Sequence, residues 1–269
     1  MSFIDTGTEQ LLCEIRDRVA IVTLNKPHKK NALGDILTPA LRAILLQLES
    51  DNRVGCLMLT GAGNAFCSGG DVSGMSASGG EPLPEQQRIA ELTHKQESLT
   101  GRLFALTKPT VAALPGAAAG AGLSLALACD LRVASDKAFV ITAFANIGLS
   151  GDYGASWFLP RLVGLARAKE MFFRSERISA QQGLQMGLIN RVFSDDSFRQ
   201  QAFDYARDIA NGPAMALRLM KKNLNQGGDQ SLSASLALEA QHLIQCAGSD
   251  ESKEAISAFI EKRPPQFHR

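Results

Sequence analysis

The chain has 269 residues, of which 45% are hydrophobic and 20% are charged, a composition typical of a globular protein with a sizeable core. Its 28 basic and 27 acidic residues leave a formal net charge of +1, which argues against a surface built to attract nucleic acid. Five cysteines and four histidines are scattered without CxxC, HxxxH or HExxH spacing. We therefore expect reduced thiols and no metal site.

From the sequence we expect neither a targeting segment nor a membrane-spanning segment. Residues 1–10 have neither a basic start nor an apolar run, so the pattern of a secretory signal is missing. The longest apolar stretch, 117–129, is too short and too rich in glycine and alanine to span a bilayer. We expect a soluble, cytoplasmic protein that binds neither a membrane nor nucleic acid.

The first two-thirds of the chain alternate segments with strand-like and helix-like patterns of hydrophobic residues. In chain order, the predicted elements are strand 19–24, helix 35–50, strand 56–60, helix 85–106, strand 110–114, buried helix 117–129, strand 138–141 and helix 165–174. An S-x-x-Q capping box over 179–182 marks the start of another helix. Small, polar and chain-breaking residues over 73–84 indicate either a loop that covers a ligand or a plain surface excursion.

From about residue 197 the pattern becomes wholly helical. The predicted helices are 198–210, 214–225, 231–246 and 250–262. Repeated strand–turn–helix units followed by helices alone predict an α/β core over 1–196 and a helical C-terminal region over 197–269.

Two glycine-bearing turns carry the chemical interpretation. The turn within Phe66–Asp71 follows a predicted strand, and the turn within Pro115–Gly122 follows another and opens an apolar helix. Small residues let a ligand approach the backbone closely. Backbone N–H groups from two such turns, converging on one oxygen, form an oxyanion hole. Such a hole suits a thioester carbonyl that becomes an enolate or a tetrahedral oxyanion.

The order and spacing of seven segments resemble the enoyl-CoA hydratase/isomerase (crotonase) family. The segments are Asn25–Leu33, Ala65–Asp71, Lys108–Ala113, Gly116–Asp130, Ile178–Gly183, Gly187–Ile189 and Phe259–Arg263. The resemblance implies an α/β spiral of ββα units with an α-helical C-terminal trimerisation region. It also implies an acyl-CoA thioester as substrate, with coenzyme A as part of that substrate and no cofactor, and assembly as a homotrimer or a hexamer of two trimers.

The resemblance also assigns binding positions. It makes the backbone N–H groups of Gly70 and Ala121 the oxyanion-hole donors, although the family usually has glycine at the second position. The residues matching the stretch that holds coenzyme A are Lys26, Lys29, Ala65 and Asp71. Lys262 matches a tail lysine that reaches the coenzyme A phosphates of its own or a neighbouring subunit. For each lysine, a solvated surface charge is the alternative interpretation.

The chain departs from the hydratases of this family at both of their catalytic glutamates. Matching the motifs places Ser124 at the first glutamate position and Phe144 at the second. A serine without an activating partner is no general base at neutral pH, and phenylalanine transfers no proton. Hydration by the two-glutamate mechanism is therefore not expected, and both residues are assigned to substrate binding only.

One carboxylate remains in the right region. Asp152 lies in the small-residue segment Gly148–Gly154, where the isomerases of the family carry a lone Asp or Glu and the aromatic acyl-CoA dehalogenases carry a nucleophilic aspartate. A lone carboxylate beside an enolate site removes a proton from C2 of a 3-enoyl thioester and returns it at C4. We predict a Δ3-to-Δ2 enoyl-CoA isomerase with Asp152 as proton shuttle. The alternative is that Asp152 caps its own turn.

Other reactions stay open at this point. They are enoyl-CoA hydration, an aspartate-dependent aromatic acyl-CoA isomerase, hydrolase or dehalogenase (with His94 as a weak candidate for an activating histidine), and acyl-CoA binding without catalysis. The tail over 250–267 resembles that of the phenylacetate-pathway isomerases, which are single-carboxylate members of the family. The aromatic side chains of Phe144, Tyr153 and Trp157 line an acyl pocket or belong to the core. Asp130 and Cys67 are interpreted as structural.

Overall fold

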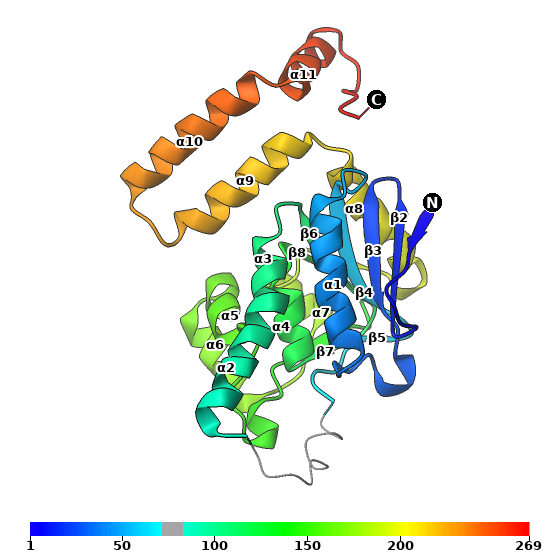
Figure 1. Cartoon of the computed structure of the whole chain (residues 1–269), viewed down its shortest axis with the longest axis vertical. Helices are drawn as coiled ribbons and strands as arrows, with labels where there is room; N and C mark the ends of the chain where they lie inside the picture. The colour runs from blue at the N-terminus through cyan, green and yellow to red at the C-terminus, as the bar shows by residue number, and fades with distance from the viewer. Residues whose placement is uncertain (72–82, 269) are drawn as a thin grey trace.

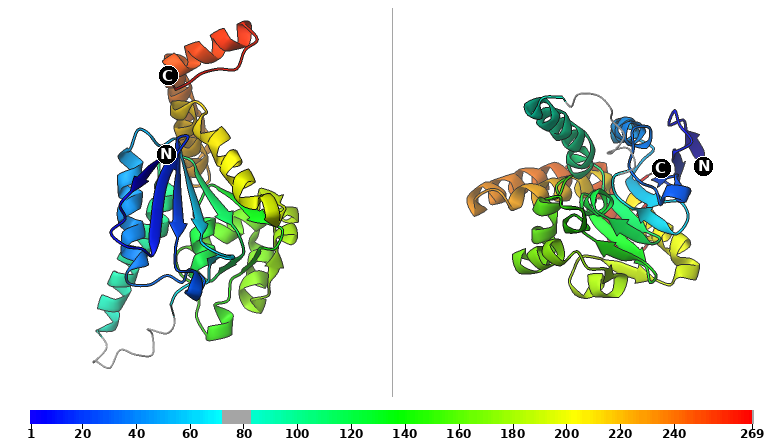
Figure 2. Two further views of the ribbon diagram at one scale, coloured as in Figure 1. Left: turned by 90° about the vertical axis from the view of Figure 1, so that its right-hand side faces the viewer. Right: turned by 90° about the horizontal axis from the view of Figure 1, so that it is seen from below.

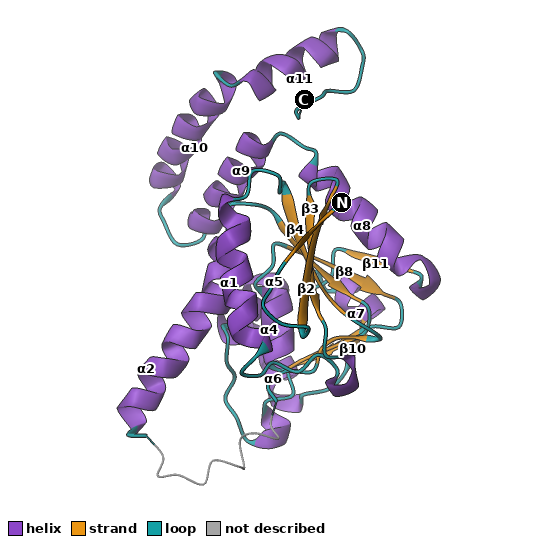
Figure 3. Cartoon of the chain, turned by 45° about the vertical axis from the view of Figure 1, so that its right-hand side comes forward, coloured by secondary structure: helices purple, strands orange, loops and turns teal. Residues whose placement is uncertain are grey.

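The computed structural model of the chain describes residues 1–71 and 83–268 (Figure 1). The loop predicted over 73–84 lies, apart from its last two residues, outside the described residues. Two sheets occupy the centre of the molecule and helices surround them, as Figure 3 shows.

The larger sheet has seven strands in the order β1-β2-β3-β4-β6-β8-β11. The strands are β1 Ser2–Ile4, β2 Leu11–Arg16, β3 Val19–Leu24, β4 Cys56–Gly61, β6 Thr110–Leu114, β8 Leu131–Ser135 and β11 Arg191–Phe193. The first three pair antiparallel and the rest pair parallel. Every residue of β4 and β6 is buried, as expected for parallel strands covered on both faces. The strands predicted over 19–24, 56–60 and 110–114 are confirmed.

The smaller sheet has four strands in the order β10-β9-β7-β5. They are β5 Ala65–Cys67, β7 Ala117–Ala119, β9 Phe139–Ile141 and β10 Ile178–Ser179. The prediction of one helix over 117–129 is wrong, because 117–119 form β7 and the helix α4 covers only Ala121–Leu127. Pairing of β7 between β5 and β9 overrides the helical preference of its alanines.

Eleven α-helices are described in these residues. They are α1 Leu37–Ser50, α2 Glu85–Gln96, α3 Arg102–Ala105, α4, α5 Ala155–Val163, α6 Leu165–Arg174, α7 Ala180–Gln185, α8 Phe198–Ala210, α9 Ala214–Gly227, α10 Leu232–Ala247 and α11 Asp250–Ile260. The single helix predicted over 85–106 is interrupted by a π-helical turn, Glu97–Gly101. Its first half is exposed, including the apolar side chains of Ile89 and Leu92. The capping box that opens α7 is confirmed.

Two apolar cores lie on opposite faces of the larger sheet. One lies among α1, α4, α5 and the smaller sheet, and α8 covers the other. Within β3, Val22 and Leu24 belong to the first core, and Val19 and Ile21 belong to the second. Helices α9–α11 project beyond the sheets (Figure 2). Helix α8, which begins at Phe198, packs directly on the larger sheet. The division of the chain at residue 197 stays a prediction.

No helix within the described ranges is both long enough and apolar enough to cross a membrane.

Candidate active site

The two glycine-bearing turns lie side by side at one edge of the smaller sheet. Strands β5 and β7 pair parallel, so the turns that follow them leave the same edge. A methyl group placed on Gly69 would lie 3.0 Å from the carbonyl oxygen of Ala119 and 3.6 Å from the backbone nitrogen of Ala121. Gly69 has φ +99° and leaves no room for a side chain, so the close approach of the turns requires glycine there.

The hydrogen bonds of these turns leave two N–H groups available. Leu33 N donates to Gly69 O at 2.8 Å, and Asp71 N donates to Leu33 O at 2.8 Å, which fixes the backbone on both sides of Gly70. No acceptor within residues 1–71 and 83–268 takes a hydrogen bond from the N–H of Gly70 or of Ala121. The two predicted oxyanion-hole donors therefore lie on adjacent turns with their hydrogen-bonding capacity unused.

Asp152 lies in a turn that is held close to the same edge. Ser124 Oγ, from the helix that begins at Ala121, donates to Asp152 O at 2.9 Å. The neighbouring residue Tyr153 donates its N–H to Gln96 Oε1 at 2.9 Å. These contacts connect the Asp152 turn to α4 and to the end of α2. Nothing in the sequence pattern pointed to Gln96, because its partner is 57 positions away along the chain.

The Asp152 carboxyl group is in an unusual environment for an aspartate. Its Oδ1 atom is buried and has no hydrogen-bond partner among the described residues. Burial, which disfavours the charged form, raises the pKa of this carboxyl from 3.8 to about 6. A carboxyl with such a pKa and an unused oxygen suits a general base that works near neutral pH. An aspartate that capped its own turn would accept a local backbone hydrogen bond through a side-chain oxygen, and among the described residues neither carboxyl oxygen of Asp152 accepts one.

The ring of Phe144 lies between the turn at Gly120 and the turn that carries Asp152. It is buried, and its ring lies 3.8 Å from the position of a methyl group on Gly120 and 3.8 Å from that of one on Gly151. The ring stacks on Phe172, with 5.8 Å between ring centroids and 18° between planes. The side chain of Phe144 therefore presents hydrocarbon, which transfers no proton, to the Gly120 and Gly151 segments.

The residues predicted to hold coenzyme A form a compact cluster beside Gly70. Lys26 Nζ and Lys29 Nζ lie 3.0 Å and 3.1 Å from Asp71 Oδ2. Buried Asn31 orders this segment: its Oδ1 accepts from Lys26 N at 2.9 Å, and its Nδ2 donates to Ala65 O at 2.8 Å. Two ammonium groups against one carboxylate leave the cluster net positive, as binding of an anion requires.

Lys262 is not brought to these residues within one chain. It follows α11, which Figure 1 places at the far end of the helical region, away from β5 and β7. Cys67 lies near the turns, but burial raises the pKa of its thiol to about 12. The thiol therefore stays protonated at neutral pH and is no nucleophile.

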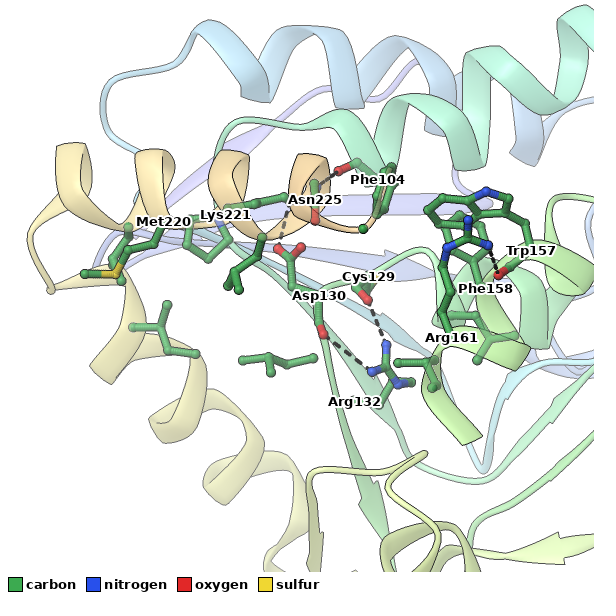
Figure 4. Close-up of a pocket in the computed structure, with 18 of the residues that line it drawn as sticks. Phe104, Cys129, Asp130, Arg132, Trp157, Phe158, Arg161, Met220, Lys221 and Asn225 are labelled. Atoms are coloured by element: carbon green, nitrogen blue, oxygen red, sulfur yellow. Dashed lines mark hydrogen bonds and ion pairs between the residues drawn. The ribbon is translucent and has the colours of Figure 1, made fainter. Parts of the chain in front are cut away.

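The predicted aromatic group is divided between two places. Phe144 belongs to the site, whereas Trp157 packs edge-to-face on Phe104 at 5.1 Å and on Phe158 at 5.0 Å. Trp157 lines a separate pocket of about 740 Å³ between α9 and the core (Figure 4). In this pocket Asp130 Oδ2 accepts from Lys221 Nζ at 2.8 Å and from Thr110 N at 2.7 Å. The interpretation of Asp130 as structural agrees with these bonds.

Comparison with known proteins identifies the family. The family model for enoyl-CoA hydratase/isomerase matches residues 14–269, and the chain belongs to this family. A 1,2-epoxyphenylacetyl-CoA isomerase from Escherichia coli K12 is 35% identical over 96% of this chain and 98% of its own. A probable enoyl-CoA hydratase from Rhodobacter capsulatus is 38% identical over 94% and 96%.

The fold agrees with this membership. The crystal structure of a putative enoyl-CoA hydratase/isomerase from Mycobacterium abscessus superposes with a TM-score of 0.90 at 31% identity, covering 96% of this chain and 99% of that one. The protein therefore has the α/β crotonase fold, with two mixed sheets and C-terminal helices, and it is an acyl-CoA enzyme of the hydratase/isomerase type.

Proposed function

We propose that this enzyme moves the double bond of a 3-enoyl-CoA thioester to the 2-position. The ionised Asp152 carboxylate takes a proton from C2, and the electron pair of that C–H bond moves onto the thioester oxygen as a dienolate. The N–H groups of Gly70 and Ala121 donate hydrogen bonds to this oxygen. The protonated Asp152 then gives its proton to C4, the C2–C3 double bond forms, and the carboxylate is restored.

The observation that carries this proposal is the half-buried carboxyl group of Asp152, whose Oδ1 atom has no hydrogen-bond partner among the described residues. The reaction needs one group that accepts and returns a proton, and no activated water. Ser124 uses its hydroxyl in a bond to the Asp152 backbone, and Phe144 supplies hydrocarbon, so both former glutamate positions support a reaction without water.

An experiment separates isomerisation from hydration. Purified enzyme is given 3-enoyl-CoA and 2-enoyl-CoA thioesters, and ultraviolet absorbance and product mass are followed in parallel with the Asp152→Asn variant. We expect the 3-enoyl substrates to become conjugated without a change in mass, and the variant to lose this activity by a factor of at least a thousand. A gain of one water from the 2-enoyl substrates would contradict the proposal.

A second candidate substrate class is an aromatic or cyclic acyl-CoA. The stacked Phe144–Phe172 pair beside the Asp152 turn favours it, because aromatic rings prefer aromatic neighbours. The 35% identity to an isomerase of 1,2-epoxyphenylacetyl-CoA points the same way. If linear 3-enoyl thioesters react poorly, phenylacetyl-type thioesters are the next to test with the same pair of enzymes.

We further propose that the positive cluster of Lys26, Lys29 and Asp71 binds the coenzyme A moiety, and that the chain assembles as a homotrimer or as a hexamer of two trimers. The helical region supports assembly because Leu224, Leu232, Ile244 and Phe259 are each at least 74% exposed in the single chain. Assembly would place Lys262 of one subunit near the site of another.

A further inference from the structure

One peptide group beside the candidate base is held at both ends by side chains from different helices. The carbonyl of Asp152 accepts from Ser124 Oγ of α4 at 2.9 Å. The N–H of the same peptide group, which belongs to Tyr153, donates to Gln96 Oε1 at the end of α2, also at 2.9 Å. Two hydrogen bonds at opposite ends of a rigid, planar unit fix the orientation of its plane.

The turn around this peptide group has one backbone hydrogen bond of its own, from Ala155 N to Asp152 O at 3.2 Å. Tyr153 has φ +50°, a left-handed conformation that side chains disfavour. The glycines on either side, Gly151 and Gly154, have φ +114° and +83°. Glycine has access to many backbone conformations, so the single internal hydrogen bond is supplemented by the contacts from α4 and α2 in fixing the shape of the turn. The direction in which the Asp152 carboxyl points depends on that shape.

Gln96 is half-buried and lies where the exposed helix α2 meets a buried segment. It is the last residue of α2 and is followed by the π-helical turn Glu97–Gly101, where Leu99 and Thr100 are buried. The backbone oxygen of Gln96 accepts from Thr100 Oγ1 at 3.2 Å, which ties it to this turn. Single π-helical turns within α-helices are frequently found at functional sites.

We propose that Gln96 is a positioning residue, whose side-chain oxygen fixes the plane of the Asp152–Tyr153 peptide and thereby aims the Asp152 carboxylate at the carbon atoms of the acyl group. The inference rests on the proposed role of Asp152 as proton shuttle. Gln96 touches no reacting atom in this account. Its loss therefore lowers the rate of proton transfer and leaves acyl-CoA binding intact.

The test uses one substitution at two positions of α2. Gln96→Leu removes the acceptor while keeping the size of the side chain, and Gln86→Leu makes the same change at an exposed position as the control. We expect Gln96→Leu to lower kcat for a 3-enoyl-CoA by ten- to a hundredfold, with KM within twofold of the wild-type value. The control is expected to match the wild type in both constants.

Two further readouts separate positioning from general damage. Hydrogen exchange at the Tyr153 amide, followed by NMR on the free enzyme, is expected to be at least tenfold faster in Gln96→Leu and unchanged in Gln86→Leu. Gln96→Glu keeps an acceptor, so slow exchange and most of kcat are expected to return at pH 8. If the leucine variant is unstable, Gln96→Asn, which shortens the reach by one methylene, gives the same comparison.

The outcomes distinguish this inference from the proposed function. Faster exchange at Tyr153 with unchanged kcat would overturn the positioning role and leave the isomerase proposal standing. Equal exchange rates in wild type and Gln96→Leu would show that the hydrogen bond does not hold the turn, and would also overturn it. Absence of turnover in the wild type would instead contradict the proposed function on which the inference rests.

Discussion

Asp152 is the residue whose environment departs most clearly from that of an ordinary surface aspartate in this site. Its side chain is partly enclosed, Oδ1 has no partner among the described residues, and burial raises the pKa of the carboxyl to about 6. Enzymes tune carboxyl groups in this way when the group must both accept and release a proton near neutral pH. The same environment has a cost for folding, because a buried carboxylate is less stable than a hydrated one.

The rate should depend on pH through this group. Asp152 must be ionised to take the proton from C2, so the fraction of active enzyme falls as the pH drops through its pKa. We expect kcat/KM for a 3-enoyl-CoA to rise between pH 4.5 and 7 with a midpoint near 6, and then to level off. Initial rates in overlapping buffers measure this profile, and a midpoint near the ordinary aspartate value of 3.8 would contradict the assignment.

Replacing Asp152 by asparagine should stabilise the fold at high pH. The folded-state pKa is raised from 3.8 to about 6, so both states are protonated well below pH 3.8, and the cost of ionising the buried group grows through this range and is complete well above pH 6. That cost is at most about 3 kcal/mol, and contact with water reduces it to about 1–2 kcal/mol. Denaturant unfolding at pH 8 should therefore show a gain of this size for Asp152→Asn, with little change at pH 4.

Asp51→Asn is a control for which we expect the opposite change in stability at pH 8. Hydrogen bonding to Arg53 lowers the pKa of the Asp51 carboxyl, so its ionised form stabilises the fold above the unfolded-state pKa. This variant should lose stability at pH 8. If Asp152→Asn lost stability at pH 8, as Asp51→Asn is expected to, the environment assigned to Asp152 would be wrong.

The elements that position the site are short, and they pack so closely that glycine is required where they touch. Helix α4 begins against the end of β5, so that a methyl group on Gly122 would lie 2.3 Å from the carbonyl oxygen of Cys67. Because the backbones of α4 and β5 are in direct contact here, there is no room for a larger residue at this position. Because Gly122 directly follows Ala121 and Cys67 belongs to the strand that leads to Gly70, we expect this contact to set the spacing between the Gly70 and Ala121 N–H groups.

Alanine substitutions at two helical glycines test this arrangement. Gly122→Ala, in α4, should destabilise the protein by about 2–4 kcal/mol through overpacking and should lower activity as the turns separate. Gly227→Ala, at the end of α9, has open space around the new methyl group and should be neutral or slightly stabilising. Chemical denaturation and enoyl-CoA turnover measure both effects. Wild-type activity in Gly122→Ala would mean that this contact does not set the spacing.

The limits of sequence-based prediction are clearest at the scale of elements. Strands β3, β4 and β6 were predictable because they are buried runs of apolar residues between clear turn signals. Strand β7 is Ala-Ala-Ala, which reads as helix, and only its pairing with β5 and β9 makes it a strand. Strands β1 and β2 were not predicted.

The residues of the candidate site divide as the strands do, into those that carry a sequence signal and those that do not. Gly70, Ala121 and Asp152 were located through motifs that resemble a known family, and the structure brings their turns together. Gln96 had no such signal, because the hydrogen bond it makes joins segments that are distant along the chain. Asn31 was part of a quoted motif, but its role in ordering Lys26 and Ala65 depends on three-dimensional contacts.

At the scale of the whole molecule, the helical region of a single chain leaves several large apolar side chains exposed. Helix α10 contacts α9 and α11 but leaves Leu232, Leu243 and Ile244 at least 69% exposed. Apolar side chains gathered on one projecting region mark a contact surface between proteins. Figure 2 shows this region standing clear of the sheets, where a second copy of the chain has access to it.

Charges placed on α10 should therefore disrupt assembly. We expect the wild type to have three or six times the mass of the 28.8 kDa chain by light scattering during gel filtration. The double variant Leu243→Glu, Ile244→Glu should shift toward the single-chain mass, since a buried unpaired charge is costly. Gln245→Glu, which adds a charge at an exposed polar position of the same helix, should leave the mass unchanged. A monomeric wild type would contradict the proposed assembly.

The most direct test of the central claim follows one hydrogen atom. A 3-enoyl-CoA carrying deuterium at C2 is converted by the wild type, and mass spectrometry locates the label in the 2-enoyl product. If Asp152 carries the proton from C2 to C4, part of the label appears at C4, the product gains no water, and Asp152→Asn forms no product. A product that contains an added water, or equal conversion by Asp152→Asn, would contradict the account.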